Sequence, residues 1–196
     1  MAAEPMLRIA ITPPEIRQGE AAMITAILDA GWDYVHLRHP AASARDVKRI
    51  IEDIPQKYHS RLRLHGHFGL VYEFNLGGLH LNSRCPEPPA GYAGPCSRSC
   101  HSVKELSEYP ECDYLTLSPI FDSVSKPGYS AAFTAAQLRQ LPGDIRVIAL
   151  GGVTPAVTGW LSEQPFAGYA VLGYLWNSSS VAELKKRLQE FEQNKN

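Results

Sequence analysis

The stretch Val147-Ile148-Ala149-Leu150-Gly151-Gly152-Val153-Thr154-Pro155 decides the fold of this chain, because it passes from an apolar run to paired glycines and then to a helix start. Four apolar residues in succession are typical of a parallel strand that is buried on both faces. Gly151 and Gly152 let the backbone approach another group closely or make a tight turn. Thr154 and Pro155 are the residue types preferred at the start of a helix, where N–H groups can hold a phosphate. The stretch therefore predicts a strand that is followed by either a phosphate site or a plain turn.

The same alternation of short apolar runs and amphipathic stretches extends along the chain and predicts repeated βα units. Strands are expected over residues 7–12, 34–38, 61–65, 78–81, 94–99, 114–118, 146–150 and 168–172. Helices are expected over residues 20–30, 44–54, 68–75, 103–109, 133–141, 155–163 and 181–193. Ser43 and Ser102 are expected as helix N-caps. The prolines and glycines of residues 85–92 indicate that the helix after the fourth strand is missing or reduced to a turn.

Eight strands that alternate with helices predict an α/β fold, a single small (β/α)8 TIM barrel over residues 1–196. An open doubly wound sheet is the alternative. In a barrel the functional residues lie at the carboxyl ends of the strands, and phosphate is often held after the seventh and eighth strands. Gly151 and Gly152 follow the seventh expected strand, and Gly173 follows the eighth.

Composition limits the classes of partner. With 44% hydrophobic residues and a formal net charge of −1, the chain gives no electrostatic reason to expect nucleic acid or an anionic membrane as a partner. No leader-like start and no apolar run of membrane-spanning length are present, so we expect a cytoplasmic protein. Cys85, Cys96, Cys100 and Cys112 lack zinc-ligand spacing and are expected to be reduced thiols.

Polar residues gather where the expected strands end. They are His36, Arg38, His39, His65, His67, His80, Asn82, Ser99, His101, Ser118, Asp122, Ser123, Ser125 and Lys126. Six of the seven histidines belong to this set, and His59 is expected in a polar surface stretch. Histidine titrates near neutral pH and can take or give a proton, so the functional end of the barrel is suited to acid–base chemistry.

Several of these residues have two interpretations. His36 and His80 lie within strands and fit core histidines as well as ligands. The alternate spacing of His65 and His67 suggests a metal pair, but no carboxylate lies at the neighbouring strand ends, so a metal is not expected. His101 lies at a strand end just before an expected helix, where it either faces the barrel mouth as an acid–base group or caps the helix.

The loop after the sixth strand and the end of the second strand offer groups for an anion. Ser123, Ser125 and Lys126 fit a lid over an anionic substrate, or alternatively a solvated turn. Arg38 fits a partner for a carboxylate or phosphate, or alternatively an ion pair at the barrel rim.

Eight short motifs follow one another in a specific order along the chain. They are Val35-His36-Leu37-Arg38, Leu64-His65-Gly66-His67, Gly78-Leu79-His80-Leu81, Arg98-Ser99-Cys100-His101-Ser102, Asp113-Tyr114-Leu115, Ser118-Pro119-Ile120-Phe121, Ile148-Ala149-Leu150-Gly151-Gly152-Val153-Thr154-Pro155 and Ala170-Val171-Leu172-Gly173. With these motifs the sequence resembles the thiamine phosphate synthase superfamily, and within it the thiazole tautomerase (TenI-type) branch. The resemblance spans nearly the whole chain and implies a (β/α)8 barrel.

The chain departs from the synthases at the positions that bind metal. In those enzymes an Asn-Asp pair after the third strand and an Asp after the fourth hold Mg²⁺ beside a pyrimidine diphosphate. The matching positions here are His65-Gly66 and Cys85, so both metal carboxylates are missing. The synthase pattern Gln-x-Arg-x-Lys appears as residues 36–40, which lack its Gln and Lys. Because Mg²⁺ prefers oxygen ligands, we expect no cofactor, and Mg²⁺ only if the chain is a synthase.

The tautomerase branch implies a specific reaction. Its members lack the metal ligands and carry an acid–base histidine after the fifth strand, a position that matches His101. The reaction is a proton shift that makes the ring of a thiazole carboxylate phosphate aromatic, and one imidazole can perform it. The expected phosphate-binding residues are Gly151, Gly152, Leu172 and Gly173. The expected substrate-binding residues are His36, Arg38, Ser99, Ser123, Ser125 and Lys126.

Two alternatives to the tautomerase remain open. One is a thiamine phosphate synthase that joins a pyrimidine diphosphate to a thiazole phosphate, and the other is a non-catalytic protein that binds a phosphorylated ligand. In each case the partner is a small phosphorylated heterocycle, and the resemblance also implies association into a homodimer.

Overall fold

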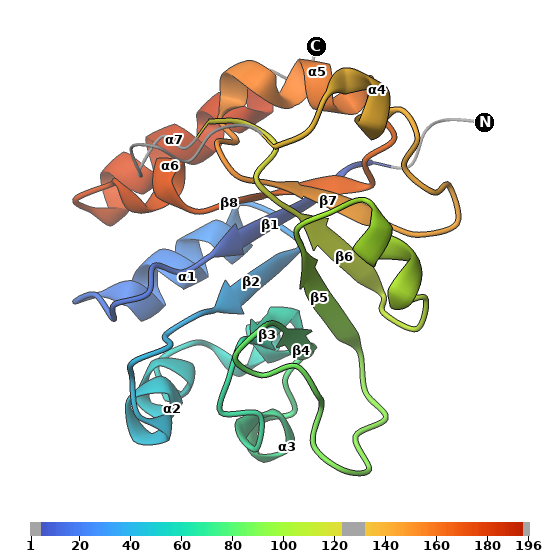
Figure 1. Cartoon of the computed structure of the whole chain (residues 1–196). Coiled ribbons are helices and arrows are strands. Elements are labelled where there is room, and N and C mark those ends of the chain that lie inside the picture. The colour runs from blue at the N-terminus through green and yellow to red at the C-terminus, as the bar shows by residue number, and fades with distance from the viewer. Residues whose placement is uncertain (1–4, 123–131, 194–196) are drawn as a thin grey trace.

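Eight parallel strands close into a barrel, which confirms the TIM barrel and rules out the open sheet (Figure 1). The computed structural model describes residues 5–122 and 132–193. The strands are β1 (Leu7–Ile11), β2 (Tyr34–Leu37), β3 (Leu62–Leu64), β4 (Gly78–Leu81), β5 (Cys96–Cys100), β6 (Tyr114–Leu117), β7 (Val147–Leu150) and β8 (Gly168–Val171). β1 pairs with both β2 and β8, and Leu7 lies opposite Gly168 where the barrel closes.

Short helices surround the strands. The α-helices are α1 (Glu20–Asp29), α2 (Ala44–Glu52), α3 (Leu70–Phe74), α4 (Ala135–Leu138), α5 (Thr158–Ser162), α6 (Gly173–Trp176) and α7 (Val181–Gln193). The 3₁₀ helices are η1 (Gln56–Arg61), η2 (Lys104–Glu108) and η3 (Pro155–Val157). No described helix is both long enough and apolar enough to cross a membrane.

The helix starts agree with the sequence in part. Ser43 caps α2, because its side chain accepts a hydrogen bond from the Asp46 N–H. Ser102 accepts from the Glu105 N–H, but the element it precedes is the 3₁₀ helix η2, whose N-cap is Val103. Thr154 is the N-cap of η3 and makes no side-chain capping bond. The helix expected over residues 155–163 is therefore a 3₁₀ turn that passes into a short α-helix.

The region between β4 and β5 contains no helix among residues 82–95, as the prolines and glycines predict. Asn82 and Cys85 instead form an isolated antiparallel bridge. This tight turn lies at the carboxyl end of β4 and places Ser83 and Arg84 at the barrel mouth.

The core has two apolar layers and one buried polar region. A small cluster of Ile9, Ile11, Tyr114, Ile148 and Ala170 fills part of the barrel. The larger layer packs strands against helices. Inside the barrel five polar side chains are also buried: His36, Arg63, His80, Ser97 and Thr116.

His59 corrects one expectation from the sequence. It was expected at the surface, but it is buried, and its imidazole lies within hydrogen-bond distance of the carbonyl oxygens of Ile51, Ile54 and Phe74. The ring therefore joins the end of α2 to α3, a role that a local polar pattern does not reveal.

Gly168 offers a test of the barrel closure. A Cβ at this position would lie 2.3 Å from the Leu7 carbonyl oxygen in β1. Gly168→Ala is therefore expected to lower the free energy of unfolding by about 1–3 kcal/mol, because the paired backbones must separate. Gly159→Ala is the matched control: its Cβ would meet nothing within 4 Å, and alanine favours the helix by about 1 kcal/mol. Urea unfolding midpoints check both changes, and equal shifts would contradict the packing argument.

Candidate functional site

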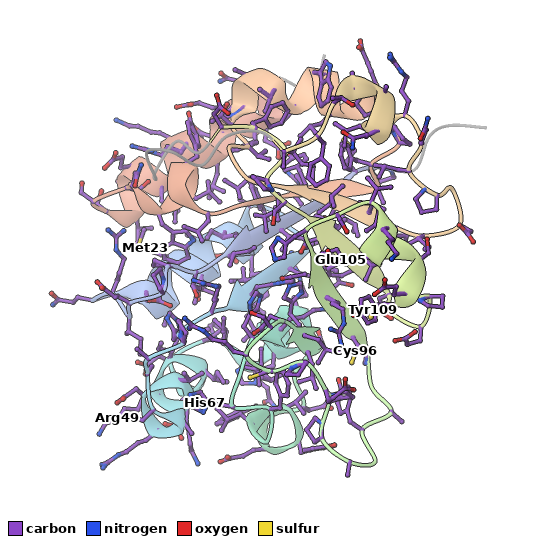
Figure 2. All side chains as sticks on the ribbon, viewed as in Figure 1. Met23, Arg49, His67, Cys96, Glu105 and Tyr109 are labelled. Carbon is purple, nitrogen blue, oxygen red and sulfur yellow. The ribbon has the colours of Figure 1, made fainter. Side chains whose placement is uncertain are left out.

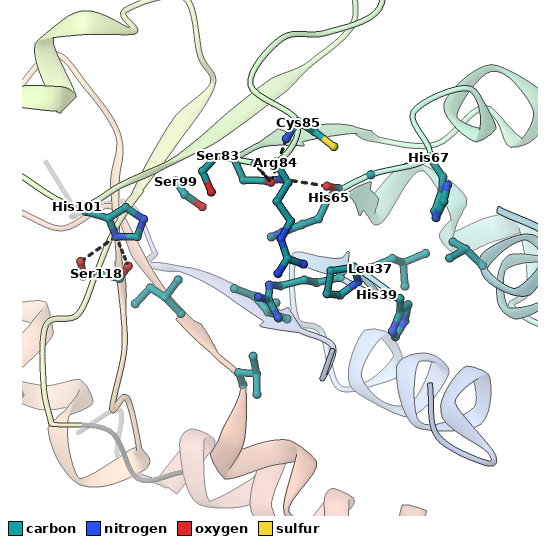
Figure 3. A pocket seen from close by; sticks show the side chains of 18 residues that line it. Leu37, His39, His65, His67, Ser83, Arg84, Cys85, Ser99, His101 and Ser118 are labelled. Atoms are coloured by element: carbon teal, nitrogen blue, oxygen red, sulfur yellow. Dashed lines mark hydrogen bonds between the residues drawn. The ribbon is translucent and has the colours of Figure 1, made fainter. Parts of the chain in front are cut away.

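A cavity of about 560 Å³ opens at the carboxyl ends of the strands (Figure 3). It is lined by Ile11, Leu37, Arg38, His39, Pro40, Val47, His65, Gly66, His67, Asn82, Ser83, Arg84, Cys85, Ser99, His101, Ser118, Leu150 and Leu172. These residues include two arginines and four histidines, and no Asp or Glu contributes to the lining within the described part of the chain. The cavity is therefore suited to an anionic ligand.

His101 lies at the mouth of this cavity, at the end of β5. Its Nδ1 is 3.3 Å from both the carbonyl oxygen and the Oγ of Ser118. A carbonyl only accepts hydrogen bonds, so this contact favours the tautomer with the proton on Nδ1 and leaves Nε2 as an acceptor. Figure 3 shows the other ring nitrogen on the side of the cavity where Ser99 and Arg84 lie.

The loop that carries His101 is fixed by Glu105. One carboxylate oxygen accepts from the His101 N–H at 3.1 Å, and the other accepts from Ser102 Oγ at 2.8 Å. The backbone at His101 is thus held by η2 while the imidazole remains exposed. This arrangement fits an acid–base group that must reach a ligand.

Three imidazoles form a cluster beneath the cavity. His36 Nδ1 lies 2.9 Å from His65 Nε2, and His36 Nε2 lies 2.7 Å from the Tyr114 hydroxyl. His80 lies between Ser97 Oγ at 2.9 Å and Ser99 Oγ at 2.8 Å. Burial lowers the pKa of all three histidines, that of His80 to about 3, so the rings are neutral at physiological pH.

His36 lies below the cavity, in agreement with the interpretation as a core histidine. Its side chain is fully buried and does not line the cavity. His65 and Ser99 do line the cavity. His65 is within hydrogen-bond distance of His36, and Ser99 is within hydrogen-bond distance of His80. His36 thus reaches the cavity only through His65 and supports that ring.

Among the described residues, these three histidines are the group whose spacing could hold a metal ion. One nitrogen from each of His36, His65 and His80 lies within 4.8 Å of the others, and imidazole is a common ligand of zinc and other transition metals. However, both nitrogens of His80 are bonded to hydroxyls, and the His65 and His80 rings stack at 4.2 Å with an angle of 23° between their planes. Lone pairs in nearly parallel ring planes do not converge on one ion, so the arrangement fits a hydrogen-bonded cluster.

His67 does not join His65 in a metal pair. It has a positive φ of 52°, is exposed, and lies within 2.8 Å of the Ala42 carbonyl oxygen through Nε2. Figure 2 shows His67 beside α2, well separated from Glu105 on the opposite side of the mouth.

Arg38 and His39 follow β2 and have different environments. His39 Nε2 lies 2.7 Å from Glu20 Oε1 in a fully buried pair, and 3.3 Å from the Thr12 hydroxyl. The Arg38 N–H donates to that same hydroxyl at 2.8 Å. Glu20 is thus occupied by His39, and the half-buried Arg38 side chain faces the cavity.

The residues expected to bind phosphate are only partly at the cavity. Leu172 lines it, whereas Gly151, Gly152 and Gly173 do not. Gly151 and Gly152 have positive φ angles of 100° and 66°. A Cβ on Gly152 would lie 2.3 Å from the Asp122 carbonyl oxygen, so close packing against the loop after β6 already requires a glycine there. Ser123, Ser125 and Lys126 lie outside the described residues.

The four cysteines are free thiols, and Cys85 lines the cavity. Burial raises the pKa of Cys100 to about 12 and that of Cys112 to about 11, so both thiols are protonated at neutral pH. The structure gives these two cysteines no nucleophilic role.

Comparison with known proteins agrees with the barrel and its order of motifs. The model of the family described as thiamine monophosphate synthase (TMP-TENI) matches residues 9–175. A thiamine-phosphate synthase from Halalkalibacterium halodurans is 28% identical over 149 residues, which cover 70% of each chain. Among solved structures, one described as thiamine phosphate pyrophosphorylase from Bacteroides thetaiotaomicron is 36% identical with a TM-score of 0.85, covering 96% of this chain and 97% of that one.

A second solved structure shows how far the fold persists beyond sequence similarity. A thiamine phosphate pyrophosphorylase from Pyrococcus furiosus has a TM-score of 0.77 at 17% identity, and the match covers 96% of this chain and 95% of that one. At that identity the likeness supports the fold alone. The family match extends over most of the barrel, from β1 to α6, and the chain therefore belongs to the thiamine monophosphate synthase (TMP-TENI) family.

Proposed function

We propose that this protein is a thiazole tautomerase of thiamine biosynthesis, with His101 as its acid–base catalyst. The observation that carries the proposal is the position of His101 at the mouth of a cavity rich in cationic and imidazole side chains, with Nδ1 on the Ser118 carbonyl and Nε2 unpaired among the described residues. A neutral imidazole held in this tautomer has the base that a proton shift requires.

The reaction needs two proton transfers at one face of the substrate. His101 Nε2 takes a proton from a ring carbon of the thiazole carboxylate phosphate, and the electron pair moves the exocyclic double bond into the ring. The imidazolium then returns a proton to the exocyclic carbon, and the product is aromatic. Atoms and charge balance without an oxidant, and Nδ1–H stays on Ser118 throughout.

The residues at two other strand ends support this choice within the family. Gly66 and Cys85 occupy the positions that match the metal carboxylates of the synthases, and Cys85 Sγ lies 3.9 Å from where a Gly66 Cβ would be. The two positions are thus neighbours in space, as a shared ligand set requires, but neither offers an oxygen. Mg²⁺ needs oxygen ligands, so these residues do not fit a magnesium–diphosphate site.

The remaining groups are assigned to binding. The substrate phosphate is expected at the N–H groups around Gly151, Gly152, Leu172 and Gly173, and Ser99 is expected to contact the ring. The test of the function is direct: the non-aromatic thiazole carboxylate phosphate is mixed with the protein, and conversion to the aromatic isomer is followed by NMR. Conversion at the rate of the protein-free control would refute the proposal.

A second candidate function is thiamine phosphate synthase, which the printed names of the relatives favour. With pyrimidine diphosphate, thiazole phosphate and Mg²⁺, we expect the wild-type protein to release diphosphate no faster than the reagents alone, because Gly66 and Cys85 supply no oxygen ligands. A coupled diphosphate assay measures this, with a curated relative of that name as the positive control. Release at the rate of the relative would establish the synthase instead.

A further inference from the structure

The cavity contains two arginines whose charges are not neutralised by neighbouring side chains. Neither the Arg38 nor the Arg84 guanidinium makes an ion pair or hydrogen bond with another described residue. Two other arginines with restricted exposure do find partners: the buried Arg63 binds Asp113 at 2.7 Å, and Arg187 binds Glu183 at 2.9 Å. The half-buried Arg38 lacks such a partner among the described residues, and the exposed Arg84 lines the same cavity.

The two guanidiniums also influence each other. Burial lowers the pKa of Arg38, and the positive charge of Arg84 lowers it further. Glu20, the buried carboxylate at the start of α1, is already paired with His39. Among the described residues that line the cavity, these two cations face no carboxylate, and the positive potential they produce favours an anion.

Arg84 is presented by a turn whose backbone is firmly held. The Asn82 side chain donates to the carbonyl oxygens of His65 at 2.9 Å and His80 at 3.1 Å, which joins the ends of β3 and β4. Its Oδ1 accepts from the N–H groups of Arg84 and Cys85. Figure 3 shows the Arg84 side chain extending from this turn into the middle of the cavity. The long side chain is thus aimed by its backbone, while the guanidinium itself is available to a ligand.

We propose that Arg84, together with Arg38, forms a second anion subsite that binds the carboxylate of the substrate. A guanidinium presents two parallel N–H donors that match a carboxylate. The subsite lies after β2 and β4, whereas the expected phosphate residues follow β7 and β8, so the two ends of a doubly anionic substrate are held on different sides of the mouth. The carboxylate identity rests on the proposed function.

The test compares two ligands that differ only in the carboxylate. Binding of aromatic thiazole carboxylate phosphate and of the same thiazole phosphate without the carboxylate is measured by calorimetry for wild type, Arg84→Gln and Arg84→Lys. We expect Arg84→Gln to weaken binding of the carboxylated ligand by about 10- to 100-fold and to leave the other ligand within about 2-fold. Arg84→Lys keeps the charge without the paired donors and should fall between these values. Arg45→Gln, an exposed arginine on α2 outside the cavity, is the matched control.

The outcomes separate the subsite from the function. Equal loss for both ligands, or no loss for either, would overturn the subsite. Loss confined to inorganic diphosphate, added as a third ligand, would assign the pair to diphosphate and overturn the carboxylate assignment. Because binding needs no turnover, selective loss in a protein that converts no tautomer would keep the subsite and reject the tautomerase. If the wild type converts the tautomer but Arg84→Gln binds both ligands as the wild type does, the tautomerase is kept and the carboxylate subsite is rejected.

Discussion

His101→Asn is expected to lower kcat for tautomer conversion by about 10²- to 10⁴-fold, the range that a positioned general acid–base group contributes. The asparagine amide resembles the part of the imidazole that carries Nδ1 and can still donate a hydrogen bond to the Ser118 carbonyl oxygen. It cannot take or return a proton at neutral pH. Binding of the aromatic product should change little, so the loss appears in kcat rather than in KM. NMR time courses under saturating substrate measure it.

Two controls keep this prediction specific. Lys104→Ala changes an exposed residue at the start of η2, close in sequence to His101 but outside the cavity lining, and is expected to retain wild-type activity. The melting temperature of His101→Asn should stay close to that of the wild type, because the His101 side chain is exposed. Undiminished conversion in His101→Asn would contradict the catalytic assignment. If the variant loses activity because it unfolds, its melting temperature falls as well, and the melting curve shows this.

Lowering the pH from 7 to 5 is expected to destabilise the protein by about 2 kcal/mol through His80 alone. The His80 side chain is fully buried, and burial lowers its pKa well below the ordinary value of 6.5. The unfolded chain therefore takes up protons below about pH 6.5 while the folded chain does not, so stability is present above that pH and is lost as the pH falls. His80, with a pKa of about 3 in the folded protein, contributes about 2 kcal/mol at pH 5. His36 and His65 add to the same trend.

Urea unfolding at pH 7, 6 and 5 measures this effect. The slope of stability against pH should correspond to about one or more protons taken up on unfolding near pH 5. His67→Asn replaces an exposed histidine at a positive φ that asparagine accepts, and it should leave the slope unchanged. A free energy of unfolding that is flat between pH 7 and 5 would show that the buried cluster is protonated in the folded state.

Periodicity predicts the architecture of this protein well, because a barrel strand is short, apolar and buried wherever it occurs. The strands expected over residues 34–38, 114–118 and 146–150 each agree with the structure to within one residue at either end. Helix length is predicted poorly. The 3₁₀ turns η2 and η3 occupy parts of segments that carry a helical pattern, and hydrogen bonding in such short elements depends on how they pack on the barrel.

The residues of the candidate site were predictable by position rather than by role. The placement of His101 and Ser99 at the mouth follows from their strand ends, since all strands of a parallel barrel end on one side. The sequence left two interpretations of His36 open, because the direction in which a strand residue points is set by the register between strands. Arg84 was not predicted to line the cavity, since its turn is fixed by bonds of Asn82 to two neighbouring strands. The signal available in the sequence was its place two residues after a strand-end asparagine.

The contact between Gly66 and Cys85 bears on how reactions diverge in this barrel. Both residues lie in turns beyond the strand ends, outside the cluster of buried histidines and the apolar layers that hold the fold. These two positions can therefore differ between barrels of this kind without a change in the packed layers. Membership of the family is for that reason a better guide to the shape of such a protein than to its reaction.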